Sequence, residues 1–242
     1  MLGYYDTHCH ILPEVDDGAI DIGMAQEMLR QEYADGVSVV FVTPHYRVGM
    51  FEPSREKVFQ QFELLKEYAR QSFPGLELHL GCEFHANMDM VMTLTKETGY
   101  SMGTSRCVLI EFSHIHDFSY IRERCYSLLR HGYLPIIAHA ERYPVLNCNI
   151  ERLNSLRNMG VFIQINARSI LGKNGFFLKR FCRKLMNHDL IDIIGSDAHD
   201  LSDRKPLIGP CARYIQRKMG NDYMEKIFIH NPTELLQESR KG

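Results

Sequence analysis

Seven short apolar runs recur along the chain, each four to eight residues long at its centre and rich in valine and isoleucine. Their apolar character is nearly continuous, which is typical of parallel strands that are buried on both faces of a sheet. We therefore predict seven parallel strands. The runs are residues 4–10, 37–45, 76–83, 107–112, 134–139, 161–166 and 190–199.

Between these runs, apolar residues recur every three or four positions, which is the period of an amphipathic helix. Three of these patterns end at Gly36, Gly132 and Gly160, and another follows Pro53 and Ser54. Glycine after a helix and proline or serine before one are common boundary signals. The predicted helical faces are Met24, Met28 and Leu29; Val58, Phe62, Leu65 and Ala69; Ile121, Cys125 and Leu128; and Leu153, Leu156 and Met159.

Strands and helices alternate throughout, which indicates an α/β protein. Seven repeats of the unit favour a distorted TIM-like (β/α)7 barrel, with an open doubly wound sheet as the alternative. The part from about Lys205 onward is predicted to form closing helices. With 242 residues, 45% of them hydrophobic, and no linker or low-complexity tract, the chain is expected to form a single domain over residues 1–242.

The formal net charge of −2 and the lack of long runs of one sign argue against general binding to long nucleic acids. No apolar run approaches the length of about 20 residues that spans a bilayer, and the N-terminus does not resemble a signal peptide. We therefore expect a cytoplasmic protein without a membrane span. The seven cysteines include no C-x-x-C pair, so we expect reduced thiols and no structural zinc ribbon.

Six of the seven apolar runs stop at a side chain that can bind a metal ion. A single histidine or glutamate in such a place is usually hydrogen-bonded or solvated, but six independent coincidences are not expected. A barrel gathers the carboxyl ends of its strands on one face, so these side chains should share one pocket. Imidazoles and carboxylates suit manganese, iron or zinc, and their number points to two or three ions. The residues are His8, His10, His45, Glu83, Glu111, His139, Asp197 and His199.

The order of short motifs along the chain resembles a known superfamily. H-x-H, V-D-D-G, T-P-H, G-x-E, I-E-F, A-H-x-E-R-Y and S-D-x-H follow one another between Asp6 and Pro232. This series resembles the polymerase and histidinol phosphatase (PHP) superfamily, and within it the bacterial tyrosine phosphatases found with capsular and exopolysaccharide synthesis genes. H-x-H alone is a weak signal, whereas the ordered set is specific.

The resemblance implies a metal-dependent protein-tyrosine phosphatase that attacks phosphorus with a metal-bound hydroxide. Manganese is the favoured ion, with iron or zinc as alternatives. The expected substrate is a phosphotyrosine protein, in particular a bacterial tyrosine kinase of polysaccharide synthesis. The implied metal ligands are His8, His10, Asp17, His45, Glu83, Glu111, His139, Asp197 and His199.

Other residues take supporting roles in this reading. Asp16 is expected to support a ligand or to cap the following helix. Arg142 and Arg204 match positions that clamp phosphate, and Arg47 is a third candidate for substrate binding, because a guanidinium meets two phosphate oxygens at once. Tyr46, Met50 and Phe51 could line a slot for an aromatic leaving group or pack against the barrel rim.

Several features leave alternatives open. His114 and His116 could support ligands or be solvated loop residues, whereas five other histidines are not expected to end a strand in register with the site. Cys211 and Arg217 have the C-x5-R spacing of cysteine-dependent phosphatases, but the glycine-free helical pattern between them indicates a coincidence. The five histidines are His79, His85, His131, His188 and His230.

Two other functions compete with the tyrosine phosphatase. One is another PHP phosphoesterase, such as a histidinol-phosphate phosphatase or a nuclease-like module. The other is a non-enzymatic PHP binding module, which would be expected to have broken motifs. All nine positions of the implied ligand set carry metal-binding residues in this chain, which argues against the binding module.

Overall fold

A computed structural model describes residues 3–96 and 99–237. Within them, nine strands pair in parallel and account for the seven predicted runs, because the second and third runs are each interrupted once. The breaks fall at Thr43–Pro44 and at Gly81–Cys82. The strands are β1 (Tyr4–Cys9), β2 (Val37–Val42), β3 (His45–Tyr46), β4 (Glu77–Leu80), β5 (Glu83–His85), β6 (Cys107–Glu111), β7 (Leu134–Ile137), β8 (Phe162–Asn166) and β9 (Ile193–Gly195).

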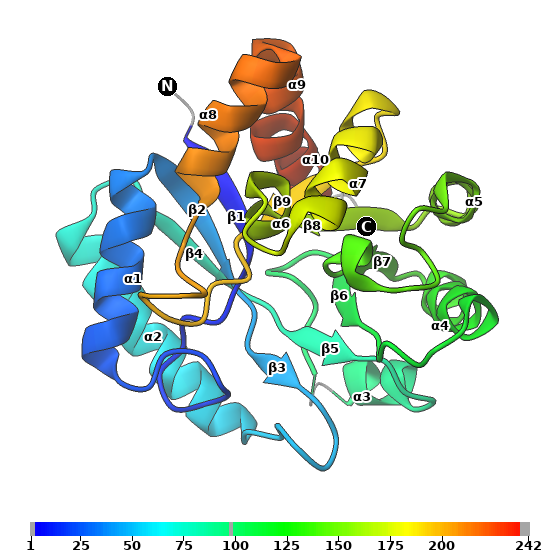
Figure 1. Ribbon diagram of the computed structural model, residues 1–242. Helices are drawn as coiled ribbons and strands as arrows, with labels where there is room; N and C mark the ends of the chain where they lie inside the picture. The colour runs from blue at the N-terminus through cyan, green and yellow to red at the C-terminus, as the bar shows by residue number, and fades with distance from the viewer. Residues whose placement is uncertain (1–2, 97–98, 238–242) are drawn as a thin grey trace.

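The strands curl into a distorted barrel (Figure 1). One sheet has the order β1-β2-β4 and the other β3-β5-β6-β7-β8-β9, and the chain runs from β2 into β3 and from β4 into β5. The curl closes between β9 and β1, where the Asp197 amide donates to the His8 carbonyl at 2.8 Å and the His10 amide to the Ala198 carbonyl at 2.9 Å. The barrel predicted from seven repeats is therefore confirmed, and the open doubly wound alternative is wrong.

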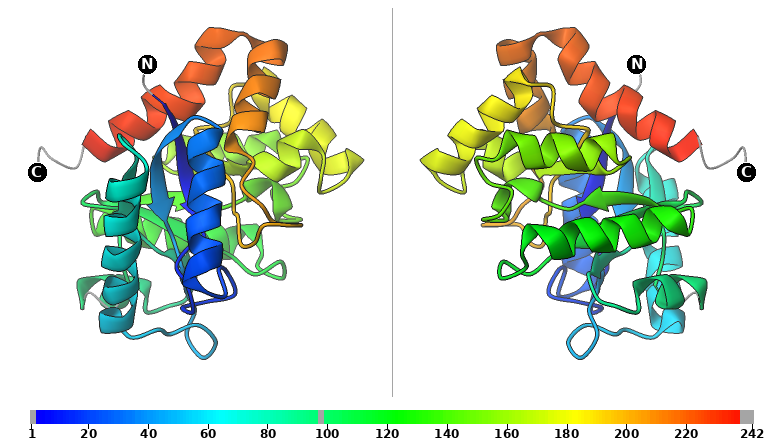
Figure 2. Two further views of the ribbon diagram at one scale, coloured as in Figure 1. Left: turned by 90° about the vertical axis from the view of Figure 1, so that its left-hand side faces the viewer. Right: turned by 90° about the vertical axis from the view of Figure 1, so that its right-hand side faces the viewer.

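Helices surround the strands on the outside (Figures 1 and 2). The four predicted helical patterns correspond to α1, α2, α4 and α5, and the part after Lys205 forms α8 to η2 and α10, with residues 238–242 outside the described range. The helices are α1 (Ile22–Ala34), α2 (Arg55–Ser72), α3 (Met90–Thr95), α4 (Phe118–Arg130), η1 (Ala140–Arg142), α5 (Ile150–Asn158), α6 (Ala167–Leu171), α7 (Phe176–Asn187), α8 (Ile208–Met219), α9 (Asn221–Glu225), the π-helical turn η2 (Lys226–His230) and α10 (Asn231–Gln237).

Side-chain caps fix where three of the long helices begin. Asp21 accepts from the Met24 amide at 2.8 Å before α1, Ser54 from the Lys57 amide at 3.2 Å before α2, and Asp117 from the Tyr120 amide at 2.8 Å before α4. Each cap satisfies one of the amides that a helix leaves unpaired at its first turn. None of the described helices is long and apolar enough to cross a membrane.

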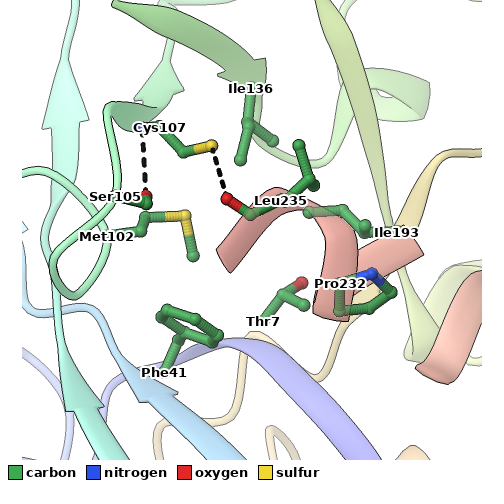
Figure 3. A pocket seen from close by; sticks show the side chains of 9 residues that line it. All are labelled: Thr7, Phe41, Met102, Ser105, Cys107, Ile136, Ile193, Pro232 and Leu235. Atoms are coloured by element: carbon green, nitrogen blue, oxygen red, sulfur yellow. Dashed lines mark hydrogen bonds between the residues drawn. The ribbon is translucent and has the colours of Figure 1, made fainter. Parts of the chain in front are cut away.

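The core has an outer layer between strands and helices and an inner layer inside the barrel. The inner layer fills the interior of the barrel with residues such as Phe41, Leu109 and Ile136. Leu235 of α10 covers the amino-terminal end of this layer, beside Cys107 at the start of β6 (Figure 3). A cavity of about 10 Å³ remains there, which is room for about one water molecule. With this end packed by apolar side chains, the polar side chains gather at the carboxyl ends of the strands.

Candidate metal centre

The carboxyl ends of the strands bring together all nine candidate metal-binding side chains. Eight of them form three overlapping groups, and within each group the donor atoms lie within 4.8 Å of one another. His139 joins them because its Nε2 lies 2.8 Å from Glu83 Oε1. The groups are His10, Asp17, His45 and His199; His8, His10 and Asp197; and His45, Glu83 and Glu111.

Glu83 lies at the centre of this cluster. Its Oε2 is 3.3 Å from His8 Nε2, 3.2 Å from His10 Nε2 and 3.1 Å from His45 Nδ1. Burial raises the pKa of Glu83, but the histidines around it outweigh burial and hold that pKa well below its usual value. Glu111 is the opposite case, because burial and then the charge of Glu83 raise its pKa to about 7. The two carboxyl groups therefore differ in how readily they release a proton.

A register shift in β1 aims two histidines at the same pocket. Asp6 pairs with Val40 and Cys9 with Val42, so β1 takes three steps where β2 takes two. The extra residue reverses which face of the strand points inward. Thr7 therefore lines the inner cavity, while His8, directly after it, reaches the metal-binding cluster together with His10.

The buried carboxylate of Asp6 holds this shift in place. It accepts hydrogen bonds from the His8 amide at 3.2 Å, from the Ser196 amide at 2.8 Å and from the Ser196 hydroxyl at 2.5 Å. Asp6 thus ties the strand that carries His8 to the segment that carries Asp197. The sequence analysis assigned no role to Asp6.

Asp16 orients two of the candidate ligands. Its Oδ2 accepts from His10 Nδ1 at 2.8 Å and from the His45 amide at 2.9 Å, and its Oδ1 accepts from the Gly18 amide at 3.0 Å. Burial lowers the pKa of His10, but the Asp16 carboxylate raises it, so that it reaches about 10. A carboxylate behind a ligating imidazole fixes the ring and increases its basicity. The supporting role predicted for Asp16 is therefore seen, whereas the alternative helix-cap role is wrong because Asp21 caps α1.

His139 and Asp197 both have left-handed backbones, with φ of +35° and +54°. Such conformations cost on the order of 1–3 kcal/mol for a residue with a side chain, and they cluster at functional sites. Here the surroundings hold them: the His139 amide donates to Gln164 Oε1 at 2.7 Å, and Asn166 Nδ2 donates to Asp197 Oδ2 at 2.7 Å. The Tyr143 hydroxyl also lies 3.1 Å from His139 Nδ1.

Gln164 and Asn166 lie beside the cluster, and the sequence analysis gave them no role. They belong to β8, which comes from the one apolar run that does not end in a metal-binding residue, and both are buried. Gln164 Nε2 donates to Asn166 Oδ1 at 2.9 Å, so the pair forms one polar network under His139 and Asp197. The sequence does contain a signal for this pair, because two polar residues two positions apart in an otherwise apolar strand point to the same face of the sheet.

Two arginines lie at the mouth of the cluster, and each is about one third exposed. Arg204 Nη2 lies 3.0 Å from Asp197 Oδ1 with the side chain 37% exposed, and Arg142 Nη1 lies 3.5 Å from Asp197 Oδ2 with the side chain 36% exposed. Arg47 stands apart from them in a tight turn, where its backbone pairs with Phe51. Its charge helps burial to lower the pKa of His85 to about 4.

The donor atoms of the cluster fit divalent metal ions. His45 Nδ1, Glu83 Oε2 and His199 Nε2 are buried and make no hydrogen bond among the described residues, because the close contacts of Glu83 Oε2 with the imidazole nitrogens do not have hydrogen-bond geometry. Burial lowers the pKa of His45 to about 4 and also lowers those of His139 and His199, so these imidazoles are neutral and can offer a lone pair. Nitrogen and oxygen donors without thiolates suit ions of hard or borderline character.

Three further histidines, His85, His114 and His116, lie near the rim of the barrel. His85 ends β5, but its Nε2 lies 3.0 Å from Ser113 Oγ and it belongs to none of the three groups of donor atoms, in agreement with the prediction that it is not in register with the site. His114 is exposed, and the His116 ring packs at a tilt against Tyr120 with ring centroids 4.1 Å apart. Neither histidine belongs to the three groups of donor atoms.

The residues predicted to line a slot for an aromatic leaving group or to pack at the rim lie in different surroundings. Tyr46 packs against Phe84 of the core, with ring centroids 5.1 Å apart, as the rim-packing alternative has it. Phe51 instead stacks on His45, with centroids 5.3 Å apart and an angle of 11° between the ring planes, and Met50 beside it is 60% exposed.

The C-x5-R pair has no phosphate cradle. Cys211 and Arg217 lie on one continuous helix, α8, and the thiol of Cys211 is fully buried. Burial raises the pKa of this thiol, so it is not a ready nucleophile. The prediction that the spacing is a coincidence is confirmed, and all seven cysteines are free thiols.

Comparisons with known proteins agree on one family. The family described as capsular polysaccharide synthesis, CpsB/CapC, matches residues 4–237. The tyrosine-protein phosphatase CpsB of Streptococcus pneumoniae is 31% identical over 238 residues, which cover 96% of this chain and 98% of that protein.

Solved structures extend this agreement to the fold. A chain from the crystal structures of YwqE from Bacillus subtilis and CpsB from Streptococcus pneumoniae, described as unique metal-dependent tyrosine phosphatases, superposes with a TM-score of 0.88 at 29% identity and covers 96% of this chain and 94% of that one. Histidinol phosphate phosphatase from Lactococcus lactis shares the fold, with a TM-score of 0.61 at 14% identity over 91% of this chain and 95% of that one. With its motifs, its barrel and its cluster of imidazoles and carboxylates, the chain belongs to the CpsB/CapC family of the PHP superfamily.

Proposed function

We propose that this protein is a metal-dependent protein-tyrosine phosphatase and that one PHP-type domain over residues 1–242 carries the activity. The observation that carries the proposal is the convergence of nine metal-binding side chains, with two arginines beside them, at one end of the barrel. The relatives named as tyrosine-protein phosphatases support the choice of substrate.

The nine side chains would hold two or three divalent ions, with manganese favoured over iron or zinc. Three overlapping groups of donor atoms support this number. When bound, such ions supply Lewis acidity, which lowers the pKa of a coordinated water and neutralises charge on phosphate. Both oxygens of Glu83 lie close to imidazole nitrogens of the cluster, so this carboxylate could bind more than one ion, whereas His10 would offer a single nitrogen because its Nδ1 is bound to Asp16.

Arg142 and Arg204 bind the phosphate of the substrate. Both guanidinium groups face Asp197 from the solvent side of the cluster, and both remain partly exposed. A phosphate dianion at the mouth would therefore meet two forked donors at once, which fixes its orientation and stabilises its charge. Arg47 lies in the turn at the rim, where it can reach the part of a substrate that extends beyond the phosphate.

Phe51 forms the wall for an aromatic leaving group. Its ring lies nearly parallel to His45 at the edge of the metal-binding cluster, and the neighbouring Val48 and Met50 are 61% and 60% exposed. A tyrosine ring entering with its phosphate toward the cluster would lie against this apolar turn, whereas a serine ester has no ring to place there.

The substrate in the cell is proposed to be a phosphotyrosine protein, in particular a bacterial tyrosine kinase of polysaccharide synthesis. We also propose a cytoplasmic location, which the seven free cysteines support because a reducing compartment keeps thiols unpaired.

The test compares three substrates on metal-stripped and reconstituted protein: a phosphotyrosine peptide, a phosphoserine peptide and histidinol phosphate. Activity should depend on the restored metal and favour phosphotyrosine. His8→Ala and Asp197→Ala should each lose bound metal and activity while the barrel stays folded, because these side chains end strands and do not fill the apolar core. His131→Ala, at an exposed helix end, is the matched control.

Full activity in either site variant, or in the stripped protein, would contradict the metal centre. A preference for histidinol phosphate would instead keep the metal centre and replace the substrate. Metal binding with no hydrolysis of any of the three esters would favour the binding-module alternative.

A further inference from the structure

The exposed side of α7 combines two unshielded phenylalanines with a wholly basic charge pattern. Residues 172–188 contain five lysines and arginines and no aspartate or glutamate, in a chain whose formal net charge is −2. Phe176 and Phe177, the first two residues of the helix, are 71% and 85% exposed. This feature has no part in the proposed phosphatase site.

The two kinds of side chain lie on the same side of the helix. Phe176, Arg180 and Arg183 follow one another at spacings of four and three residues, and Phe177, Arg180 and Lys184 at spacings of three and four. Residues with these spacings are neighbours on a helix surface. The opposite side packs into the core through Phe181, Cys182, Leu185 and Met186.

A hydrogen-bonded turn precedes the two exposed phenylalanines at the start of α7. Arg168 Nε donates to Asn174 Oδ1 at 3.0 Å, and Asn174 Nδ2 donates to Ser169 Oγ at 3.0 Å. Gly175, with φ of +99°, then turns the chain into α7. The rings of Phe176 and Phe177 meet edge to face, with centroids 5.9 Å apart. In Figure 2 the yellow helix α7 stands at the edge of the molecule.

The basic side chains of this surface are available for a partner. Arg180, Arg183 and Lys184 are exposed, and they form no ion pair within residues 3–96 and 99–237. Lys179 is different, because its amino group donates to the Leu171 carbonyl and lies 5.2 Å from the centroid of the Tyr214 ring. The exposed residues Phe176, Phe177, Arg180, Arg183 and Lys184 are together called the α7 surface.

We propose that the α7 surface docks the protein on an anionic membrane. Anionic headgroups complement a surface with three cations and no carboxylate, and aromatic rings at the end of a basic helix enter the headgroup region without needing a shaped pocket. The parallel strands β8 and β9 are connected by the short helix α6, which follows the carboxyl end of β8, and then by α7, which leads back to the start of β9. The phenylalanines at the start of α7 are thus nearer along the chain to the carboxyl end of β8 than to the start of β9.

The test uses the full chain with phosphatidylcholine vesicles that contain or lack phosphatidylglycerol. Sedimentation should show binding to the anionic vesicles, weakened by salt. The triple change Arg180→Gln/Arg183→Gln/Lys184→Gln should lower the affinity on the order of 100-fold, since each basic residue near such a surface contributes about 1 kcal/mol. Arg122→Gln/Arg217→Gln/Lys218→Gln removes the same charge from other exposed positions and should change the affinity little.

The absence of tryptophan from the chain permits a second measurement. Phe177→Trp should shift its fluorescence to shorter wavelength when anionic vesicles are added, whereas Phe59→Trp on α2, a residue 38% exposed in the native chain, should not. Phosphatase activity on a soluble peptide should be the same in all these variants, because none of the residues belongs to the metal-binding cluster.

Three results would overturn the proposal. One is equal affinity for both kinds of vesicle, and another is an unchanged affinity in the α7 triple variant. The third is wild-type self-association that Phe176→Ser/Phe177→Ser abolishes without any effect on vesicle binding, which would assign the α7 surface to a second copy of the chain.

Discussion

At the scale of single residues, the cluster depends on what stands behind each imidazole. Asp16 accepts from His10 Nδ1, and the carbonyl of Asp197 lies 3.0 Å from His199 Nδ1, so both rings turn Nε2 toward the pocket. Residue types in strand-end positions could be predicted from the sequence. Of the partners behind them, only Asp16 was predicted, whereas Gln164 and Asn166 of β8 were missed because that apolar run ends in no metal-binding residue.

Replacing Asp16 by asparagine should lower metal affinity by about 10–100-fold, the usual effect of losing a partner behind a ligating histidine. The carboxylate accepts three N–H groups through two oxygens, whereas an amide offers one oxygen and turns an NH2 group toward the remaining donors. Competition with a chelator would measure the change. Asp21→Asn, which keeps a good helix cap, should leave the affinity unaltered, and equal affinities in the two variants would remove Asp16 from the site.

Replacing Arg142 or Arg204 by glutamine should lower kcat/KM for phosphotyrosine. The corresponding loss of transition-state stabilisation should be about 1.5–3 kcal/mol, the usual net contribution of a hydrogen bond to a charged group. Metal content should be unchanged, because an arginine side chain does not ligate. Lysine should restore only part of the loss, since an ammonium group cannot form the forked contact. Steady-state kinetics with metal analysis would check this, and wild-type kinetics in both glutamine variants would make these arginines ordinary surface residues.

At the scale of elements, parallel strands explain why so much of the site could be predicted. Side chains at the carboxyl ends of neighbouring strands must meet, whatever their distance in sequence. The exceptions have local causes. The register shift in β1 depends on Asp6 and Ser196, which lie 190 residues apart, and the break between β2 and β3 lies at Pro44, whose missing N–H cannot join a ladder. The spacing of hydrophobic residues along the chain predicts neither the register shift nor the strand break.

Gly195 in β9 lets neighbouring strands approach the site closely. A Cβ there would lie 2.4 Å from His8 Cβ and 2.9 Å from Gln164 Nε2. Gly195→Ala should therefore displace His8, weaken metal binding and destabilise the fold by about 1–3 kcal/mol, as overpacking usually does. Gly23→Ala in the first turn of α1, where the nearest atom is 3.3 Å away, is the control and should keep both properties. Chelator competition and thermal unfolding give the two readouts, and native metal affinity in Gly195→Ala would show that the contact can relax.

At the scale of the whole molecule, the barrel separates a packed end from a polar end. The number of strand runs predicted the barrel, and the helical pattern after Lys205 predicted closing helices. That α10 would seal the inner core was not predictable, because a closing helix can cover either the outside of a barrel or its end. In this protein α10 covers the end, because Leu235 lines the same inner cavity as Met102, Phe41 and Ile136 (Figure 3).

Leu235→Ala should separate stability from activity. The side chain is 7% exposed beside a cavity of about 10 Å³, so its truncation enlarges a void that the surrounding strands cannot close. The expected cost is about 2–5 kcal/mol of the free energy of unfolding, and a protein of this size loses about 2–4 °C in Tm for each kcal/mol. Leu64→Ala, at a position 57% exposed on α2, should change stability by less than about 0.5 kcal/mol. Because the metal-binding cluster lies at the other end of the barrel, kcat/KM measured well below the lowered Tm should match the wild type. A parallel loss of metal and activity in Leu235→Ala at that temperature would mean that the two ends of the barrel are coupled.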